Sequence, residues 1–522
     1  ITSSKSISLA IPNLQVAGAG PEASVKVNFF GGSLNTRPVT VQINGVPIIN
    51  AYPLSGFSGK DTTVSIAKNR IAGSTTIEFI NGSTSVYDQY LVGQFEITYP
   101  RKFDAGSSTM FACTLDASSS DQLIEISSFK FGTNLPVLYD LTNQLTYVAE
   151  VKGGNLRFLL PQDSKKRNVM VFNTAAEDIN QVNTLSELRF LDFSNTSNQG
   201  DYIIITDSLI RKSKNGDAIE HYKQYRSSAV GGNFKVLVVN VQELTNQFAY
   251  GIKKHPLAMK RFIQFAATFF KPNNVLLIGK GVTYDQYRMN ESSSFANQLN
   301  IVPTFGSPAS DHILASKDLG PLAQIPIGRL SVVNGDELNN FLDKLKQHED
   351  LLNTSTSYQS VDKKGWTKNV LHLVAGGVVQ PVVTGYMNEA ARKISDSLFG
   401  AKVFTIEKTS AASVETGNNT QIDQLFQNGL GVVNYFGHSS LNAMEFNLDD
   451  PGRFNNQGKY PLFLANACTA GNNFFYDSLR IVSNKKSISE AYMLEPQKGS
   501  IAFIASTHYG ILMNLNDFIQ RF

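Results

Sequence analysis

The sequence predicts a multidomain protein in which all-β, sandwich-like modules precede an α/β domain with a mainly parallel sheet. Up to about residue 200, short segments alternate apolar and polar residues between Gly, Asn, Ser and Pro turns, which is typical of antiparallel sandwiches. From residue 201 onwards the apolar segments are continuous and alternate with helical patterns. Continuous apolar strands are typical of a parallel sheet whose two faces are both covered by helices.

The β-rich part is expected to form two modules. Alternation is clearest in VTVQINGV at 39–46, and further short strands are predicted in TTIEFI, LVGQFEITYP, LRFLLP and NVMVFNT. The segment YPRKFD at 99–104 interrupts the pattern. We therefore expect a β module over residues 1–100 and a second β-rich module over residues 101–200.

The α/β domain is expected over residues 201–522. Its predicted strands are DYIIITDS, FKVLVVNV, NNVLLIGKG, NVLHLVAGG, GVVNYFGHSS, PLFLANAC and GSIAFIAST. Between them lie amphipathic patterns such as Leu338, Phe341, Leu342 and Leu345, which recur at helical spacing. Strands and helices that alternate in this way predict a doubly wound sheet, whose ligands and catalytic groups gather at the carboxyl ends of the strands.

Composition excludes several classes of protein. The net charge of +3 and the absence of long Lys/Arg runs argue against a nucleic-acid or membrane-surface patch. Two cysteines, Cys113 and Cys468, are too few for a disulfide framework or a Cys-rich metal site. The chain begins at Ile1 and ends just after an apparent helix start, so we expect a fragment of a longer or processed protein, truncated at its C-terminus.

Two predicted strands are followed by side chains that can act in catalysis, an imidazole and a thiol. His438 follows VVNYFG and Cys468 follows PLFLANA, so adjacent parallel strands would bring both to one rim. An imidazole beside a thiol activates it as a nucleophile for acyl transfer, and the backbone N–H groups of Ser439 and Cys468 are placed to bind the oxyanion. The structural alternatives are a Cys that acts as a small buried hydrophobic residue and a His that caps a strand.

Other motifs are weaker. The segment GKGVTYD at 279–285 lacks the third Gly of a dinucleotide-binding fingerprint. No G-x-S-x-G elbow of a serine hydrolase occurs.

Three ordered motifs resemble the gingipain family of cysteine peptidases. They are VVNYFGHSS, KYPLFLANACTAGNNFF and GSIAFIAST, and four supporting segments match in order: DYIIITDS, NNVLLIGKG, SDHILAS and IPIGRLSV. The resemblance covers roughly residues 201–522. It implies a caspase-like α/β fold, a catalytic dyad of Cys468 and His438, and an oxyanion hole of the kind inferred above.

The β modules ahead of this domain are similar to the arrangement in the C-terminal signal peptidase, or sortase, of the type IX secretion system of Bacteroidetes. This resemblance implies an enzyme at the cell surface, on the extracellular face of the outer membrane, that removes the C-terminal signal domain of secreted cargo proteins and attaches the cargo to anionic lipopolysaccharide. It further implies an outer-membrane β-barrel partner. No cofactor is required, structural calcium is compatible with the family, and no nucleic acid is expected.

The chain also departs from the family pattern. Gingipains carry Gly directly after the His, whereas this chain has Ser439, and no Asp or Glu occurs between Lys364 and Glu389. Arg- or Lys-specific cleavage is therefore not carried over from the family, and we expect another group or a backbone carbonyl to orient His438. Asp311 in SDHILAS matches an acidic family position near structural cations and is the one metal candidate, against its interpretation as a loop carboxylate. The alternative function is a non-catalytic surface scaffold or adhesion protein that retains the fold.

Overall fold

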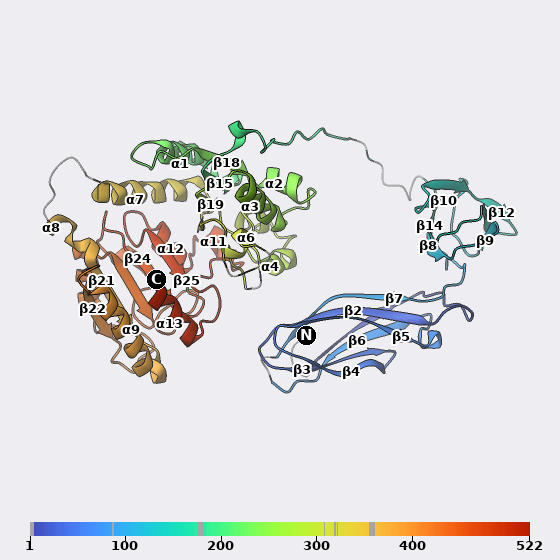
Figure 1. Cartoon of the computed structure of the whole chain (residues 1–522), viewed down its shortest axis with the longest axis horizontal. Helices are drawn as coiled ribbons and strands as arrows, with labels where there is room; N and C mark the ends of the chain where they lie inside the picture. Colours follow the sequence, from blue (N-terminus) through green and yellow to red (C-terminus); the bar gives the residue numbers. More distant parts are fainter. Residues whose placement is uncertain are drawn as a thin grey trace. The chain divides into compact units, whose positions relative to one another are not determined.

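The computed structural model describes residues 5–85, 88–175, 182, 184–306, 308–317, 320, 322–353 and 361–522. The chain forms two compact units, Ile1–Glu187 and Leu188–Phe522. The first unit contains antiparallel sheets, and the second contains parallel sheets with helices (Figure 1). This arrangement confirms the predicted fold class.

The first core of the N-terminal unit lies between two antiparallel sheets. Alternate residues of β3 are fully buried, which explains the period of two in VTVQINGV. Asn44 and Gly45 both have positive φ, 48° and 77°, as the two-residue turn of a hairpin requires. The first sheet has the spatial order β1 (Ser6–Ile11), β6 (Thr75–Asn81), β3 (Arg37–Ile43) and β4 (Val46–Leu54). The second sheet has the order β5 (Gly59–Ile66), β2 (Ala23–Gly31) and β7 (Tyr90–Thr98).

A second core of the same unit is built from shorter antiparallel strands. It contains Phe111, Leu138, Leu156, Phe158 and Val171, all of them buried. One sheet has the spatial order β11 (Leu145–Val148), β10 (Val137–Asp140), β14 (Arg167–Phe172) and β8 (Met110–Leu115). The other has the order β12 (Glu150–Lys152), β13 (Asn155–Leu160) and β9 (Gln122–Ile126).

The second unit contains a four-stranded parallel sheet that is covered by helices. Its strands, in spatial order, are β18 (Val236–Asn240), β15 (Tyr202–Thr206), β19 (Asn274–Ile278) and β20 (Ile327–Leu330), and a short ribbon, β16 (Lys212–Ser213) with β17 (Gly216–Asp217), precedes the first helix. Every residue of β15 is buried. Its core takes side chains from α1 (Ala218–Ser227), α2 (Val241–Phe248), α3 (Leu257–Phe269) and α7 (Gly335–Asn353), and also from α6 (His312–Ala315) and α12 (Ile488–Leu494).

A five-stranded parallel sheet completes the second unit. Its order is β22 (Lys402–Glu407), β21 (Asn369–Val374), β23 (Val432–Phe436), β24 (Leu462–Asn466) and β25 (Ala502–Ala505). Phe436 and Val374 pack with α9 (Gln380–Ile394) and α13 (Leu512–Arg521), whereas Val433 and Tyr435 pack with α10 (Asn419–Asn428) and α12 (Ile488–Leu494). Helices therefore cover both faces of this sheet, which explains the continuous apolar strands.

The shorter helices lie in the connections. They are α4 (Tyr284–Met289), α5 (Ala296–Leu299), α6 (His312–Ala315), α8 (Val361–Lys364) and α11 (Leu479–Val482). Among the described residues, no helix has the length and apolar character needed to cross a membrane.

Candidate active site

The structure places His438 and Cys468 at the same rim of the five-stranded sheet. Their strands, β23 and β24, are parallel neighbours, and Phe436 pairs with Asn466 at the last position of the ladder. Each of the two candidate residues lies two positions beyond that pair, at the carboxyl edge. The Ser439 hydroxyl donates to the Cys468 carbonyl and joins the two loops directly. Adjacent strands lie about 4.8 Å apart, so the predicted juxtaposition follows from the strand order.

The Cys468 thiol is half-buried and accepts a hydrogen bond. The backbone N–H of Gly510 donates to Sγ at 3.4 Å. The next residue, Thr469, has a φ of 54°, in the left-handed region, and its N–H donates to the His508 carbonyl at 2.9 Å. This contact and the Thr469 bond fix the sulfur and the start of its loop against the segment that follows β25.

His438 is fixed through its main chain. Its N–H donates to Oε2 of Glu445 at 2.7 Å, and its carbonyl accepts from the buried phenol of Tyr435. Glu445 in turn forms an ion pair with Lys408, 3.4 Å between Oε1 and Nζ, and both side chains are mostly buried. The Glu445 carboxylate, which is paired with the Lys408 ammonium, and the Tyr435 phenol therefore hold the N–H and the carbonyl of His438. We call these contacts the clamp.

The approach of these groups depends on Gly437. A Cβ at this position would lie 2.7 Å from the Tyr435 hydroxyl, 2.8 Å from Cβ of Ala375 and 2.9 Å from Oε2 of Glu445. Side-chain atoms essentially never come that close, so only glycine allows the clamp to form.

The His438 imidazole is exposed and makes no hydrogen bond within the described part of the chain. A Cβ built on Gly377 would lie 4.0 Å from its Nε2 atom, so the ring faces the turn that follows β21. This turn belongs to the segment that lacks acidic residues. The clamp therefore fixes the main chain of His438, and no carboxylate among the described residues bonds to its ring.

Two backbone donors at the rim are available to a substrate oxygen. Over the described ranges, the N–H groups of Ser439 and Cys468 donate to no protein acceptor. They flank the point at which the two loops touch. Their assignment to an oxyanion hole stays a prediction, as does the assignment of the dyad itself.

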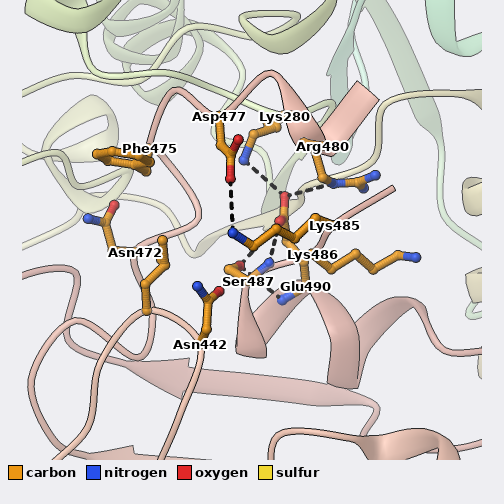
Figure 2. Close-up of a pocket in the computed structure, with 11 residues that line it drawn as sticks. Lys280, Asn442, Asn472, Phe475, Asp477, Arg480, Lys485, Lys486, Ser487 and Glu490 are labelled. Atoms are coloured by element: carbon orange, nitrogen blue, oxygen red, sulfur yellow. Dashed lines mark hydrogen bonds and ion pairs between the residues drawn. The ribbon is translucent and has the colours of Figure 1, made fainter. Parts of the chain in front are cut away.

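A small pocket, open to solvent, adjoins the two rim loops. Leu441 and Asn442 belong to the loop that follows His438, and Asn472 and Phe475 to the loop that follows Cys468 (Figure 2). Charged groups form the rest of the wall: Lys280, Asp477, Arg480, Lys485, Lys486 and Glu490, with Ser487. Sequence reasoning did not identify this cavity.

Asp311, the metal candidate, is engaged by an arginine. Its two carboxylate oxygens accept from Nε and Nη2 of Arg329 at 2.6 and 2.8 Å, and the Thr304 hydroxyl adds a third bond. No cluster of three or more His, Cys, Asp or Glu residues suited to a metal occurs among the residues that the structure describes. Both carboxylate oxygens of Asp311 are thus engaged by Arg329, and a cation at this residue stays a prediction.

Comparison with known proteins identifies the family. The model of peptidase family C25 matches residues 195–522. The chain belongs to peptidase family C25, the gingipain family of cysteine peptidases. The match spans both parallel sheets and includes His438 and Cys468. None of the curated proteins compared with the chain matches it.

Solved structures of C25 peptidases are similar at low identity. Dimeric latent PorU from Porphyromonas gingivalis is 14% identical, with 73% of this chain and 40% of that chain covered and a TM-score of 0.43. The Arg-specific cysteine proteinase gingipain R is 17% identical, with 64% and 68% covered and a TM-score of 0.44. The complex of the pro- and mature domains of RgpB from Porphyromonas gingivalis is 17% identical, with 61% of this chain and 66% of that chain covered and a TM-score of 0.44. The chain thus spans two fifths of the PorU chain.

Three functional candidates of this C25 peptidase were missed by sequence reasoning. Glu445 and Lys408 lie in connections without periodicity, seven residues after the His and one residue after β22. Lys280 lies in the GKG segment considered above for nucleotide binding. The one available signal was position: each of the three follows a strand of a parallel sheet, and Lys280 and Lys408 do so within two residues.

Proposed function

We propose that this chain is a cysteine peptidase in which Cys468 is the nucleophile and His438 the general acid and base. The observation that carries the proposal is the position of both residues at the carboxyl edge of adjacent strands in a chain of family C25.

We infer the following steps of acyl transfer. His438 takes the proton of the Cys468 thiol, and the sulfur attacks the peptide carbonyl carbon. The negative oxygen that forms is within reach of the free N–H groups of Ser439 and Cys468. His438 then gives its proton to the leaving amine, and water or a second amine resolves the thioester. Hydrolysis and transpeptidation differ only in this last nucleophile.

For the biological reaction we propose removal of the C-terminal signal domain from cargo of the type IX secretion system, and transfer of the cargo to anionic lipopolysaccharide. The motifs at the rim and the β modules ahead of the peptidase domain support this proposal. It places the protein at the cell surface, beside an outer-membrane β-barrel partner. We do not extend Arg specificity to this chain, because the segment faced by the His438 ring has no carboxylate.

The experiment compares cells that carry the parent protein with cells that carry Cys468→Ala. Loss of signal removal in the variant, with cargo retained in its uncleaved form, supports the proposal. Normal cleavage of the cargo in the variant refutes the assignment to signal removal, even where the purified parent hydrolyses other proteins.

A second candidate function is a non-catalytic surface scaffold. The observation that favours it is the exposed imidazole of His438, which has no acceptor for its second nitrogen among the described residues. In catalytic triads such an acceptor holds the required tautomer. A scaffold predicts a Cys468 thiol of ordinary reactivity and no turnover of any protein substrate by the purified chain.

A further inference from the structure

The loop that carries the proposed nucleophile is held from two sides. We call residues 468–476 the nucleophile loop. On the side of its own sheet, the N–H groups of Thr469 and Gly471 donate to the carbonyls of His508 and Ser506 at 2.9 and 3.0 Å. These two bonds fix the beginning of the loop, next to Cys468.

The far part of the nucleophile loop is held by a segment of the other sheet. Nζ of Lys280 donates to the Asn473 carbonyl at 2.5 Å, and the Thr283 N–H donates to the Phe474 carbonyl at 3.1 Å. Lys280 lies two residues beyond the end of β19. The bond from Lys280 therefore connects the rim of the four-stranded sheet with the loop that follows β24.

The ammonium of Lys280 is buried and compensated. The residue is 3% exposed, and its Nζ lies 3.1 Å from Oε1 of Glu490 (Figure 2). Glu490 also accepts from the Ser331 hydroxyl at 2.7 Å and from the Ser487 N–H at 3.0 Å, and Arg480 lies 3.5 Å away. Burial alone would raise the pKa of Glu490, but the two cations and these hydrogen bonds lower it. Burial lowers the pKa of Lys280, and the Glu490 carboxylate opposes this shift. The two groups are held together by their 3.1 Å contact.

Stability alone gives no reason for such a pair. Replacing a buried ion pair with apolar residues of similar volume is often neutral or stabilising, because desolvation costs about as much as the charges gain. What the pair provides is a donor of fixed position, aimed at one main-chain carbonyl of the nucleophile loop. The Glu490 carboxylate beside Lys280 offsets part of the cost of burying the ammonium.

We propose that Lys280 is a positioning residue of this peptidase: by holding the Asn473 carbonyl, it keeps the thiol and the N–H of Cys468 in place relative to His438. The inference rests on the proposed function, since it concerns the same nucleophile. It adds a residue that touches neither the dyad nor the substrate.

The chain offers a matched control in Lys344. This lysine is fully buried and donates to the Tyr492 and Met493 carbonyls in α12 at 3.0 and 3.1 Å. Its acceptors lie outside the nucleophile loop. Lys280→Met and Lys344→Met therefore each remove a buried lysine that donates to main-chain carbonyls. Lys280 also pairs with Glu490, and only its substitution releases the loop.

A third variant, Lys280→Met with Glu490→Gln, avoids an uncompensated buried carboxylate and protects the fold. A fourth, Lys280→Arg, keeps a cationic donor. For all variants of the full chain we would measure unfolding by the fluorescence of Trp366, the single tryptophan, the rate of Cys468 alkylation by iodoacetamide against pH, and kcat and KM on a peptide substrate.

The proposal predicts that the folded double variant loses about tenfold or more in kcat with KM nearly unchanged, because small displacements of reacting groups are costly. Its alkylation profile shifts to higher pH, Lys280→Arg recovers part of both losses, and Lys344→Met changes neither. The proposal is overturned if the double variant alkylates and turns over like the parent, if Lys344→Met loses as much, or if both Lys280→Met variants unfold.

The two readouts separate this inference from the proposed function. If the parent hydrolyses no peptide, the peptidase assignment fails. The alkylation profiles of the variants then still decide whether Lys280 positions the thiol.

Discussion

Replacing Glu445 with Gln tests how His438 is held. The carboxylate accepts from the His438 N–H at 2.7 Å and pairs with Lys408 at 3.4 Å. Gln keeps the shape and one acceptor oxygen but removes the charge. The variant therefore weakens the clamp on the His438 backbone without opening a cavity.

The expected magnitude follows from these two contacts. A hydrogen bond to a charged group contributes about 1.5–3 kcal/mol, and the neutral amide oxygen retains part of that value. The loss of the mostly buried partner of Lys408 adds to the cost. We expect a net loss of about 1–2 kcal/mol in the positioning of His438, which corresponds to a roughly 5- to 30-fold fall in kcat/KM.

The assay is hydrolysis of a peptide substrate under steady-state conditions, with Glu407→Gln as the control. Glu407 ends β22, next to Lys408 in sequence, and bonds to Thr384 at 3.3 Å instead of to the His438 loop. The control is expected to stay within twofold of the parent. The reasoning is refuted if Glu445→Gln is as active as Glu407→Gln, or if both lose activity equally.

Three further predictions use neighbouring residues. Gly437→Ala places a Cβ within 3 Å of three groups and should cost about 1–3 kcal/mol of stability and most of the activity; a parent-like urea midpoint would contradict this. Ser439→Ala removes the hydroxyl bond to the Cys468 carbonyl and should lower kcat/KM about fivefold, measured on the same peptide; no change would mean that the bond does not join the loops in function. Burial lowers the pKa of His372 to about 4, so the unfolded chain binds a proton that the native chain does not. Stability should therefore fall by about 3 kcal/mol as the pH drops from 6.5 to 4, and His372→Leu should reduce this fall in Trp366-detected urea unfolding; an identical fall in both proteins would contradict the assignment.

The order of elements could be predicted because local patterns encode it. Continuous apolar runs in the second half became parallel strands, and Leu338, Phe341, Leu342 and Leu345 are buried along α7 as their spacing indicates. The rim positions of His438 and Cys468 followed from the same patterns, since a strand that ends on a polar residue delivers it to the edge of the sheet.

The partners that hold the rim could not be predicted. Glu445 and Lys408 meet across 37 residues of sequence, and Lys280 meets Glu490 across 210. These contacts depend on strand order and on the path of irregular loops, which leave no periodic signal. The segment GKG suggests nucleotide binding when the sequence is taken alone. The structural role of its lysine, Lys280, is not visible there, because the carbonyl it binds, that of Asn473, is 193 residues away in the sequence.

The reactivity of Cys468 tests the account most directly. Cys113 provides an internal reference, because burial raises the pKa of its thiol to about 11. Iodoacetamide alkylation of both cysteines, followed by mass spectrometry across a pH series, reports the thiolate fraction of each. The account predicts that His438→Ala slows the alkylation of Cys468 at pH 7 by about tenfold or more and leaves the rate of Cys113 unchanged. A Cys468 rate that His438→Ala does not change would contradict it.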